Sequence, residues 1–324
     1  MSSASPACLI CGGTVLAERY HGLRDLIGRS SATYAFLACS RCGSLTADPL
    51  PTPEEAASFY PEQYTFREQA AGSPADRMVG KLLWWGYPRW TYTSDVALTI
   101  RVSGQRRGRL LDIGCGTGTH LGLFRRAGFD AEGIELSAED CAVARQVTGC
   151  TVHHGTLERA RLASAQFDVV TMFNVLEHLL NPRETAGSIR DLLRPGGWLV
   201  AKVPVSDGWQ PSVFGRRWRN VREVPRHLSL PSTSGMTALF RACGMTQVRR
   251  RAASLLENAC MAGTTLYPWA IPYVNEARFT QPAIKLLNTG IGALLTYLSI
   301  PEAILESLAG HPSTVIVAGQ RPSA

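Results

Sequence analysis

Charged residues are scarce in this sequence, and the basic ones form no long block. Asp, Glu, Lys and Arg make up 18% of the 324 residues and hydrophobic residues 45%, which is typical of a globular chain with one elaborated domain or two domains. The net charge of +7 is compatible with phosphorylated substrates, anionic membranes or nucleic acid. Because the basic residues occur only in short clusters such as 249–251, charge alone selects none of these partners.

Two further absences concern the cellular compartment. The first ten residues lack the charged start and the long apolar run of a secretory signal, so we expect a cytoplasmic protein. The cysteines number nine, and an odd number fits reduced thiols better than a disulfide framework.

Four of these cysteines form two C-x-x-C pairs, Cys8 with Cys11 and Cys39 with Cys42. Two thiolates three positions apart on a tight turn can reach one tetrahedral ion, and a glycine follows each pair. Four thiolates leave no open position on the ion. The pattern therefore predicts a structural zinc ion and a zinc-ribbon domain over residues 1–50, with a strand leading into the second pair.

Residues 51–100 are expected to form a helical and aromatic linker and lid. A proline-rich boundary precedes a short acidic helix, for which Pro53 suits the first turn. Tyr60 and Tyr64 follow, and they either face a substrate pocket or pack the linker against the main domain. Residues 81–90 hold three of the seven tryptophans, which suits a substrate lid, a membrane interface or burial under the main domain.

The glycine-rich segment 109–118, RLLDIGCGTG, organises the rest of the chain. An apolar run and Asp112 lead into glycines at 114, 116 and 118, and a helical pattern follows. Gly114 and Gly116 let the backbone approach a ligand where a Cβ would collide, and Gly118 lets the next helix lie close to its strand. Alone, this segment is either an ordinary turn or the entry to a nucleotide-type pocket.

Strands and helices alternate around this segment. Strands are expected at 109–113, 130–135, 151–155, 167–173 and 198–204, of which 167–173 is nearly all apolar, as a strand buried on both faces should be. Helices are expected at 119–128 and 137–149, and a third opens with Asn181 as its cap and Pro182 in its first turn and ends at a turn over 193–197. Parallel strands joined by helices predict a doubly wound α/β sheet whose ligands bind at the carboxyl ends of the strands. Glu135 ends the second strand, where a carboxylate can accept both ribose hydroxyl protons.

Together, LDIGCGTG, GIELS, FDVVTMFNVLEH and LRPGGWLVAKVP resemble the class I S-adenosylmethionine-dependent methyltransferases over about residues 100–250. The resemblance implies a seven-stranded Rossmann-like sheet, in a methyltransferase domain over residues 101–324. The antiparallel seventh strand is found only at 313–319, so residues 251–312 form an apolar helical insertion before it.

The same resemblance implies where the cofactor binds. The loop from Asp112 through Gly114 and Gly116 to Gly118 would cradle its methionine and ribose parts, and Glu135 would bind the ribose. Asn174 would lie near the methionine part. Thr156 and Leu157 would lie beside the adenine, where the usual acidic residue is missing unless Glu158 serves.

The insertion carries an apolar helical stripe, Ile284, Leu287, Ile291, Leu294 and Leu298, and a second helix opens at Pro301. The run is too short and interrupted to indicate a transmembrane helix. It predicts a lid over the substrate, a homodimer interface, or a peripheral membrane contact through residues 283–309.

The cysteine pairs, the segment 59–66 and the RHLSL segment resemble a narrower group, the zinc-containing methyltransferases of sugar, glycan and natural-product pathways. Methyl transfer to a hydroxyl requires removal of a proton, and histidine is the usual base near neutral pH. His178 and His227 lie at expected pocket edges, and Glu177 is placed to orient one of them or to bind substrate. Either histidine is alternatively a packed side chain, and for His153 and His154 we expect packing or surface roles.

These observations predict methyl transfer from S-adenosylmethionine to a small molecule, at a hydroxyl of a sugar, glycan precursor or natural product. Alternatives are C-methylation of a keto-deoxysugar, RNA methylation with the zinc ribbon as the binding module, and a binding protein without catalysis. RNA is disfavoured because residues 12–38 hold few basic residues and no aromatic–basic stripe. The intact glycine loop and Glu135 speak against the loss of catalysis.

Overall fold

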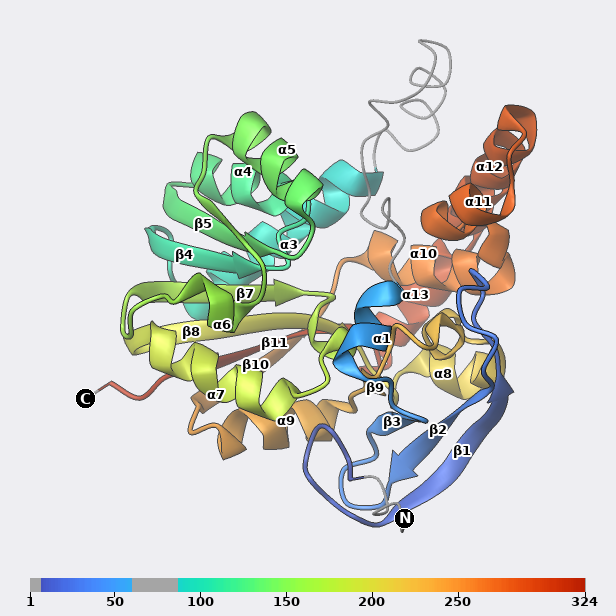
Figure 1. The fold of residues 1–324 in the computed structure, drawn as a ribbon, viewed down its shortest axis with the longest axis horizontal. Coiled ribbons are helices and arrows are strands. Elements are labelled where there is room, and N and C mark those ends of the chain that lie inside the picture. The colour runs from blue at the N-terminus through green and yellow to red at the C-terminus, as the bar shows by residue number, and fades with distance from the viewer. Residues whose placement is uncertain (1–6, 60–86, 324) are drawn as a thin grey trace.

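The computed structural model describes residues 7–59 and 87–323, and these form two sheets (Figure 1). The larger sheet has seven strands in the order β10-β11-β8-β7-β4-β5-β6. The strands of this sheet are β4 (Gly108–Ile113), β5 (Phe129–Glu135), β6 (Val152–His154), β7 (Phe167–Phe173), β8 (Leu193–Pro204), β10 (Thr246–Ala252) and β11 (Thr314–Gln320). Strand β11 is antiparallel to both of its neighbours, and the other printed pairs in this sheet are parallel. The predicted seven-stranded, doubly wound sheet is confirmed.

Helices cover both faces of this sheet because its central strands, such as β7, are buried on both sides. Along β7, Val169 belongs to one buried cluster and Val170 to the other. Helices α3 (Tyr87–Ser103), α4 (Thr119–Arg126) and α5 (Ala138–Thr148) lie on one side, and α7 (Pro182–Leu192) and α9 (Thr233–Ala242) on the other (Figure 1). The short helix α6 (Leu157–Ala160) packs with the second group.

Two local expectations differ from the structure. The Asn181 side chain makes no capping hydrogen bond to α7, which starts directly at Pro182. Strand β8 begins at Leu193 and includes the expected turn, because Phe167 pairs with Leu193 while Val169 pairs with Trp198. The four residues 194–197 therefore bulge from the strand without ending it.

The smaller sheet is antiparallel and joins distant parts of the chain. Strands β1 (Leu16–Leu23), β2 (Tyr34–Cys39) and β3 (Leu45–Asp48) form a meander, and β9 (Ser229–Leu230) pairs with β3. Helix α1 (Pro53–Ser58) follows and starts with a capping box from Thr52. The N-terminal sheet is thus completed by residues that lie after β8.

The insertion is helical, as predicted. It contains α10 (Leu255–Leu266), the 3-10 turn η4 (Pro268–Ala270), α11 (Pro272–Arg278), α12 (Pro282–Leu298) and α13 (Ile300–Leu308). Three further short elements lie between β8 and β9, outside the insertion: α8 (Trp209–Phe214) and the 3-10 turns η2 (Gly215–Arg217) and η3 (Arg219–Glu223). Helix α12 packs closely on α10, because a Cβ on Gly263 would lie 2.7 Å from the Thr296 backbone nitrogen.

The apolar stripe of α12 does not form its packed face. Leu287, Leu294 and Leu298 are 60%, 58% and 66% exposed, and the buried side chains are small or polar ones such as Ala293 and Thr296. Close packing of two helices favours small residues, which explains this arrangement. Among the described helices, none is long and apolar enough by itself to cross a membrane, although α12 and α13 together, bent by 41°, pass the length and composition test.

Candidate active site

The glycine loop follows β4 and leads into α4 at the carboxyl edge of the large sheet. Gly114, Gly116 and Gly118 have φ values of 71°, 53° and 87°, which only glycine adopts without strain. A Cβ on Gly118 would lie 3.0 Å from the Ala144 Cβ of α5, and one on Gly114 would lie 2.5 Å from a methyl carbon of Val175. The glycines therefore allow both the turn and the close approach of neighbouring elements.

Glu135 is fixed against this loop. Its two carboxylate oxygens accept backbone N–H bonds from Gly116 and Ser137, each at 2.9 Å. Each oxygen keeps acceptor capacity beyond one such bond. The carboxylate is thus held at the end of β5, beside the loop, and its contact with a ribose stays a prediction.

Two buried acceptors lie near the same edge. Asp112 accepts a 2.6 Å hydrogen bond from the Thr171 hydroxyl through Oδ1, while its Oδ2 has no hydrogen-bond partner among the described residues. Burial raises the pKa of Asp112 to about 6. Asn174 follows β7 with φ of 55°, and within the described parts of the chain its Oδ1 also lacks a partner. Buried acceptors without partners fit the ammonium and hydroxyl donors of S-adenosylmethionine.

The predicted adenine side lies after β6. Gly155 donates its N–H to the Glu135 carbonyl oxygen at 2.8 Å, which continues the parallel pairing of β6 with β5 by one residue. Thr156 precedes α6 and is exposed, Leu157 is half-buried and Glu158 is exposed. The role of these residues stays a prediction.

A buried charged network, which sequence reasoning missed, connects the sheet to the insertion. The ammonium of Lys202 on β8 lies 2.7 Å from Asp95 Oδ2 on α3 and 2.8 Å from Glu257 Oε2 on α10. His120 lies 3.0 Å from the same Asp95 oxygen. Burial alone lowers the pKa of Lys202, but the attraction of the two carboxylates outweighs burial and raises this pKa above its ordinary value. A lysine within an otherwise apolar strand was the only sequence signal for this network.

The catalytic candidates Glu177, His178 and His227 come together. One ligand atom from each lies within 4.8 Å of the others, and the two imidazole rings are 4.8 Å apart between centroids. Burial and the neighbouring His227 lower the pKa of His178 to about 3, and burial also lowers the pKa of His227. Burial raises the pKa of Glu177 to about 8. Both histidines are therefore neutral at physiological pH.

The four predicted zinc ligands also converge. The Sγ atoms of Cys8 and Cys42 lie 3.7 Å apart and those of Cys11 and Cys39 lie 3.5 Å apart. Tetrahedral zinc with Zn–S bonds of about 2.3 Å places its sulfurs about 3.8 Å apart. The donor set and its geometry fit a structural zinc ion.

Other candidates lie elsewhere. Tyr60 and Tyr64 are outside the described residues. His153 pairs with Glu132 Oε2 at 3.1 Å, and the exposed His154 lies 3.0 Å from the Leu136 carbonyl oxygen.

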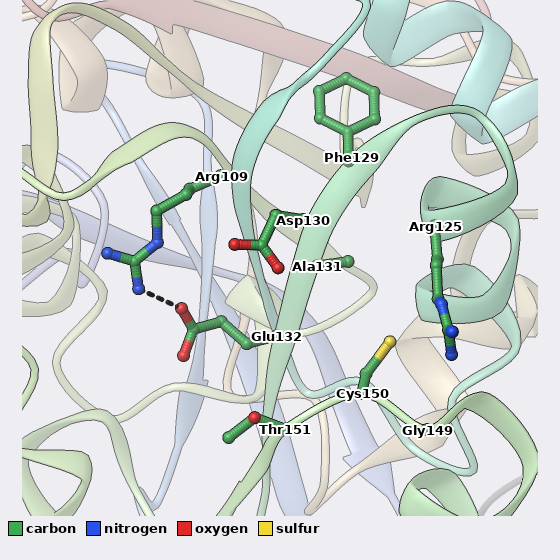
Figure 2. Close-up of a pocket in the computed structure, with 9 residues that line it drawn as sticks. All are labelled: Arg109, Arg125, Phe129, Asp130, Ala131, Glu132, Gly149, Cys150 and Thr151. Carbon is green, nitrogen blue, oxygen red and sulfur yellow. Dashed lines mark hydrogen bonds and ion pairs between the residues drawn. The ribbon is translucent and has the colours of Figure 1, made fainter.

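A pocket of 470 Å³ lies at the opposite edge of the sheet, by the amino ends of β4 and β5. Beside this pocket Arg109 lies 2.6 Å from Glu132, and the dashed line in Figure 2 marks this ion pair. Because ligands of doubly wound sheets bind at the carboxyl edge, this pocket is not part of the cofactor site.

Comparison with known proteins agrees with this geometry. Residues 92–249 match a family described as "Methyltransferase domain". The chain is 33% identical over 137 residues to the dTDP-3-amino-3,4,6-trideoxy-alpha-D-glucopyranose N,N-dimethyltransferase of Streptomyces venezuelae, covering 41% of this chain and 56% of that protein. It is 31% identical over 149 residues to the tRNA U34 carboxymethyltransferase of Geobacter sp., covering 43% and 45%.

A solved structure is similar over most of the chain. It is the Phospholethanolamine N-methyltransferase 2 of Haemonchus contortus in complex with phosphomonomethylethanolamine and S-adenosylhomocysteine. It has a TM-score of 0.51 at 16% identity and covers 95% of this chain and 69% of that one, which shows a shared fold. Residues 92–249 therefore match a methyltransferase domain, and the solved structure shows that the chain has a methyltransferase fold. It spans about half the length of the two curated relatives described above.

Proposed function

We propose that this protein transfers a methyl group from S-adenosylmethionine to a hydroxyl of a small molecule, namely a sugar, glycan precursor or natural product. The observation that carries the proposal is the glycine loop, fixed to Glu135 at the carboxyl edge of the sheet. The same edge holds the unsatisfied acceptors of Asp112 and Asn174.

S-adenosylmethionine supplies a methyl group on a sulfonium, so that the acceptor oxygen bonds the methyl carbon while the carbon–sulfur bond breaks and its electron pair stays on sulfur. In our proposal, Glu135 accepts from the ribose hydroxyls, and Asp112 and Asn174 accept from the methionine end. Thr156 and Leu157 border the adenine. The Glu177–His178–His227 cluster binds the acceptor and draws off the proton that the hydroxyl must lose.

The remaining parts of the chain have supporting roles in this proposal. Residues 1–50 are a zinc-ribbon domain held by a structural zinc ion, residues 51–100 are a linker and lid that includes Tyr60 and Tyr64 as substrate contacts, and residues 101–324 are the catalytic domain. The sugar-nucleotide relative supports a sugar acceptor. Methylation of a carbon beside a keto group would use the same cluster on an acidic C–H.

We further propose that the outward face of α12 and α13 contacts a membrane surface. Beyond Leu287, Leu294 and Leu298 of α12, this face includes Leu305 and Leu308, which are 57% and 81% exposed. The net charge of +7 favours anionic lipid. Homodimerisation through this face would instead show as a concentration-dependent mass.

The cofactor assignment is tested by isothermal titration with S-adenosylmethionine. We expect the wild type to bind, and Glu135→Gln to bind about 10- to 100-fold more weakly, because a charge-assisted hydrogen bond contributes about 1.5–3 kcal/mol. Glu132→Gln is the matched control, since Glu132 lies on the same strand but pairs with Arg109 and His153. Absence of binding by the wild type would overturn the proposal.

The acceptor is tested with methyl-labelled cofactor. We expect label in hydroxylated sugar nucleotides or lipid-linked sugars, and hydrolysis-resistant ether products. Label that appears only in tRNA would instead favour the RNA alternative, which is retained because one relative is a tRNA-modifying enzyme.

A further inference from the structure

The Glu177–His178–His227 cluster has a feature that proton transfer alone does not require. Glu177 is 1% exposed, and its Oε2 has no hydrogen-bond partner within the described residues. A buried carboxylate oxygen without a partner is costly, and such groups often face an ion or a ligand.

The two imidazoles have the tautomer that metal ligands use. Nδ1 of His178 lies 2.9 Å from the Arg226 carbonyl oxygen, and Nδ1 of His227 lies 2.9 Å from the Asn220 carbonyl oxygen. Only an N–H can donate to a carbonyl, so each ring carries a proton on Nδ1, and Nε2 is the atom that would coordinate a metal ion. Metal-binding histidines are oriented in this way by backbone carbonyls.

The backbone that provides these carbonyls is firmly held. The Arg226 guanidinium donates to Asp25 at 3.0 Å, and both side chains are fully buried. The next residue but one, Leu228, donates to the Glu177 carbonyl oxygen and accepts from Ala47 of β3. The ring orientations are thus fixed from the N-terminal sheet as well as from the 3-10 turn η1 (Leu176–His178).

We propose that Glu177, His178 and His227 bind one divalent transition-metal ion. Two imidazole nitrogens and one carboxylate suit zinc, iron or cobalt, and such a set leaves open positions on the ion. Glu223 lies beside it, with Oε2 3.5 Å from His227 Nε2, and is positioned to orient that ring or to join the ligands. This site is distinct from the cysteine tetrad in both residues and ligand chemistry.

The position of the proposed ion, close to the glycine loop, also suggests a role in methyl transfer. Val175, two residues before Glu177, packs against Gly114 of the glycine loop. An acceptor hydroxyl bound to an open position would donate an oxygen lone pair to the ion, and its lowered pKa would ease the proton loss that methyl transfer requires. This use rests on the proposed methyl transfer, whereas metal binding itself does not.

The test uses the full-length protein with its cysteine site loaded with zinc, titrated with Co²⁺. We expect one additional equivalent of cobalt, with weak visible bands and no intense thiolate-to-cobalt absorption. Glu177→Gln and His227→Gln should each weaken cobalt binding at least about 10-fold, because losing a ligand costs at least as much as losing an outer-shell partner. His153→Gln, at the β6 edge, is the control and should bind as the wild type does.

The wild-type titration is decisive even where a variant folds poorly. Absence of an additional cobalt equivalent in the wild type would overturn the proposal, as would unchanged affinity in a His227→Gln protein of native circular dichroism. Isothermal titration with S-adenosylmethionine separates the two conclusions: cofactor binding without cobalt leaves only the methyltransferase assignment, and cobalt without cofactor leaves only the metal site.

Discussion

Replacing Lys202 by Met should destabilise the protein more than almost any other single change. The ammonium lies between the Asp95 and Glu257 carboxylates at 2.7 and 2.8 Å, and the three side chains are at most 3% exposed. Removing one partner of a buried ion pair leaves an uncompensated charge and costs about 3–5 kcal/mol. Because Met fills a similar volume, the loss of stability reflects the missing charge and hydrogen bonds more than the creation of a cavity.

Urea denaturation followed by circular dichroism measures this loss as a lower midpoint at an unchanged slope. Without Lys202, folding would bury two carboxylates whose ionised forms repel, so the loss should be greater at pH 8 than at pH 5. Adding Glu257→Gln to the variant should recover part of the loss. The matched control is Arg101→Met, at an exposed position on α3. Its free energy of unfolding should lie within about 0.5 kcal/mol of the wild-type value. A Lys202→Met loss below about 1 kcal/mol would refute the reasoning.

Three other predictions follow from separate parts of the molecule. Cobalt added to metal-free protein should give strong thiolate-to-cobalt absorption that Cys39→Ser removes and Cys243→Ser keeps; equal spectra for the two variants would contradict the cysteine site. Burial raises the pKa of Glu306 from 4.5 to about 7, so its neutral form is favoured in the folded state and stability falls as pH rises through this range. Glu306→Gln should therefore be neutral at pH 5 but stabilising by up to about 3 kcal/mol at pH 8.5 in thermal or urea unfolding, and a pH-independent effect would argue against it. The wild type should float with anionic vesicles, whereas the triple variant Leu287→Ser, Leu294→Ser, Leu298→Ser should not; no difference would remove the membrane proposal.

Local patterns were sufficient to predict the large sheet and part of its site. The apolar strands and the glycine loop are short-range signals, so the seven-stranded sheet, its antiparallel last strand and the position of Glu135 at a strand end follow once the family resemblance is recognised. The cysteine spacing likewise predicts a tetrad, and the four sulfurs converge in the structure.

Long-range pairing was not predictable in the same way. Lys202 is 107 residues from Asp95 and 55 from Glu257, and no periodicity relates them. Strand β9 has only two residues, too few for a pattern. The sequence predicted the leucine stripe of α12 but not the face on which the helix packs, because hydrophobicity alone does not show that Gly263 admits only small side chains opposite it.

The two-residue strand β9 has a consequence for the order in which the chain folds. The N-terminal sheet contains β1 to β3, yet its last strand is Ser229–Leu230, and Cys42 accepts hydrogen bonds from the hydroxyls of Ser232 and Ser234. Domains emerging from the ribosome usually fold from the N-terminus as units. Here the N-terminal sheet, which is synthesised first, gains its last strand only after residue 230 has emerged. The two cysteine turns are therefore next to an incomplete sheet until that point. That same edge lies next to His227, so we expect completion of the N-terminal sheet and assembly of the Glu177–His178–His227 cluster to occur together, late in folding.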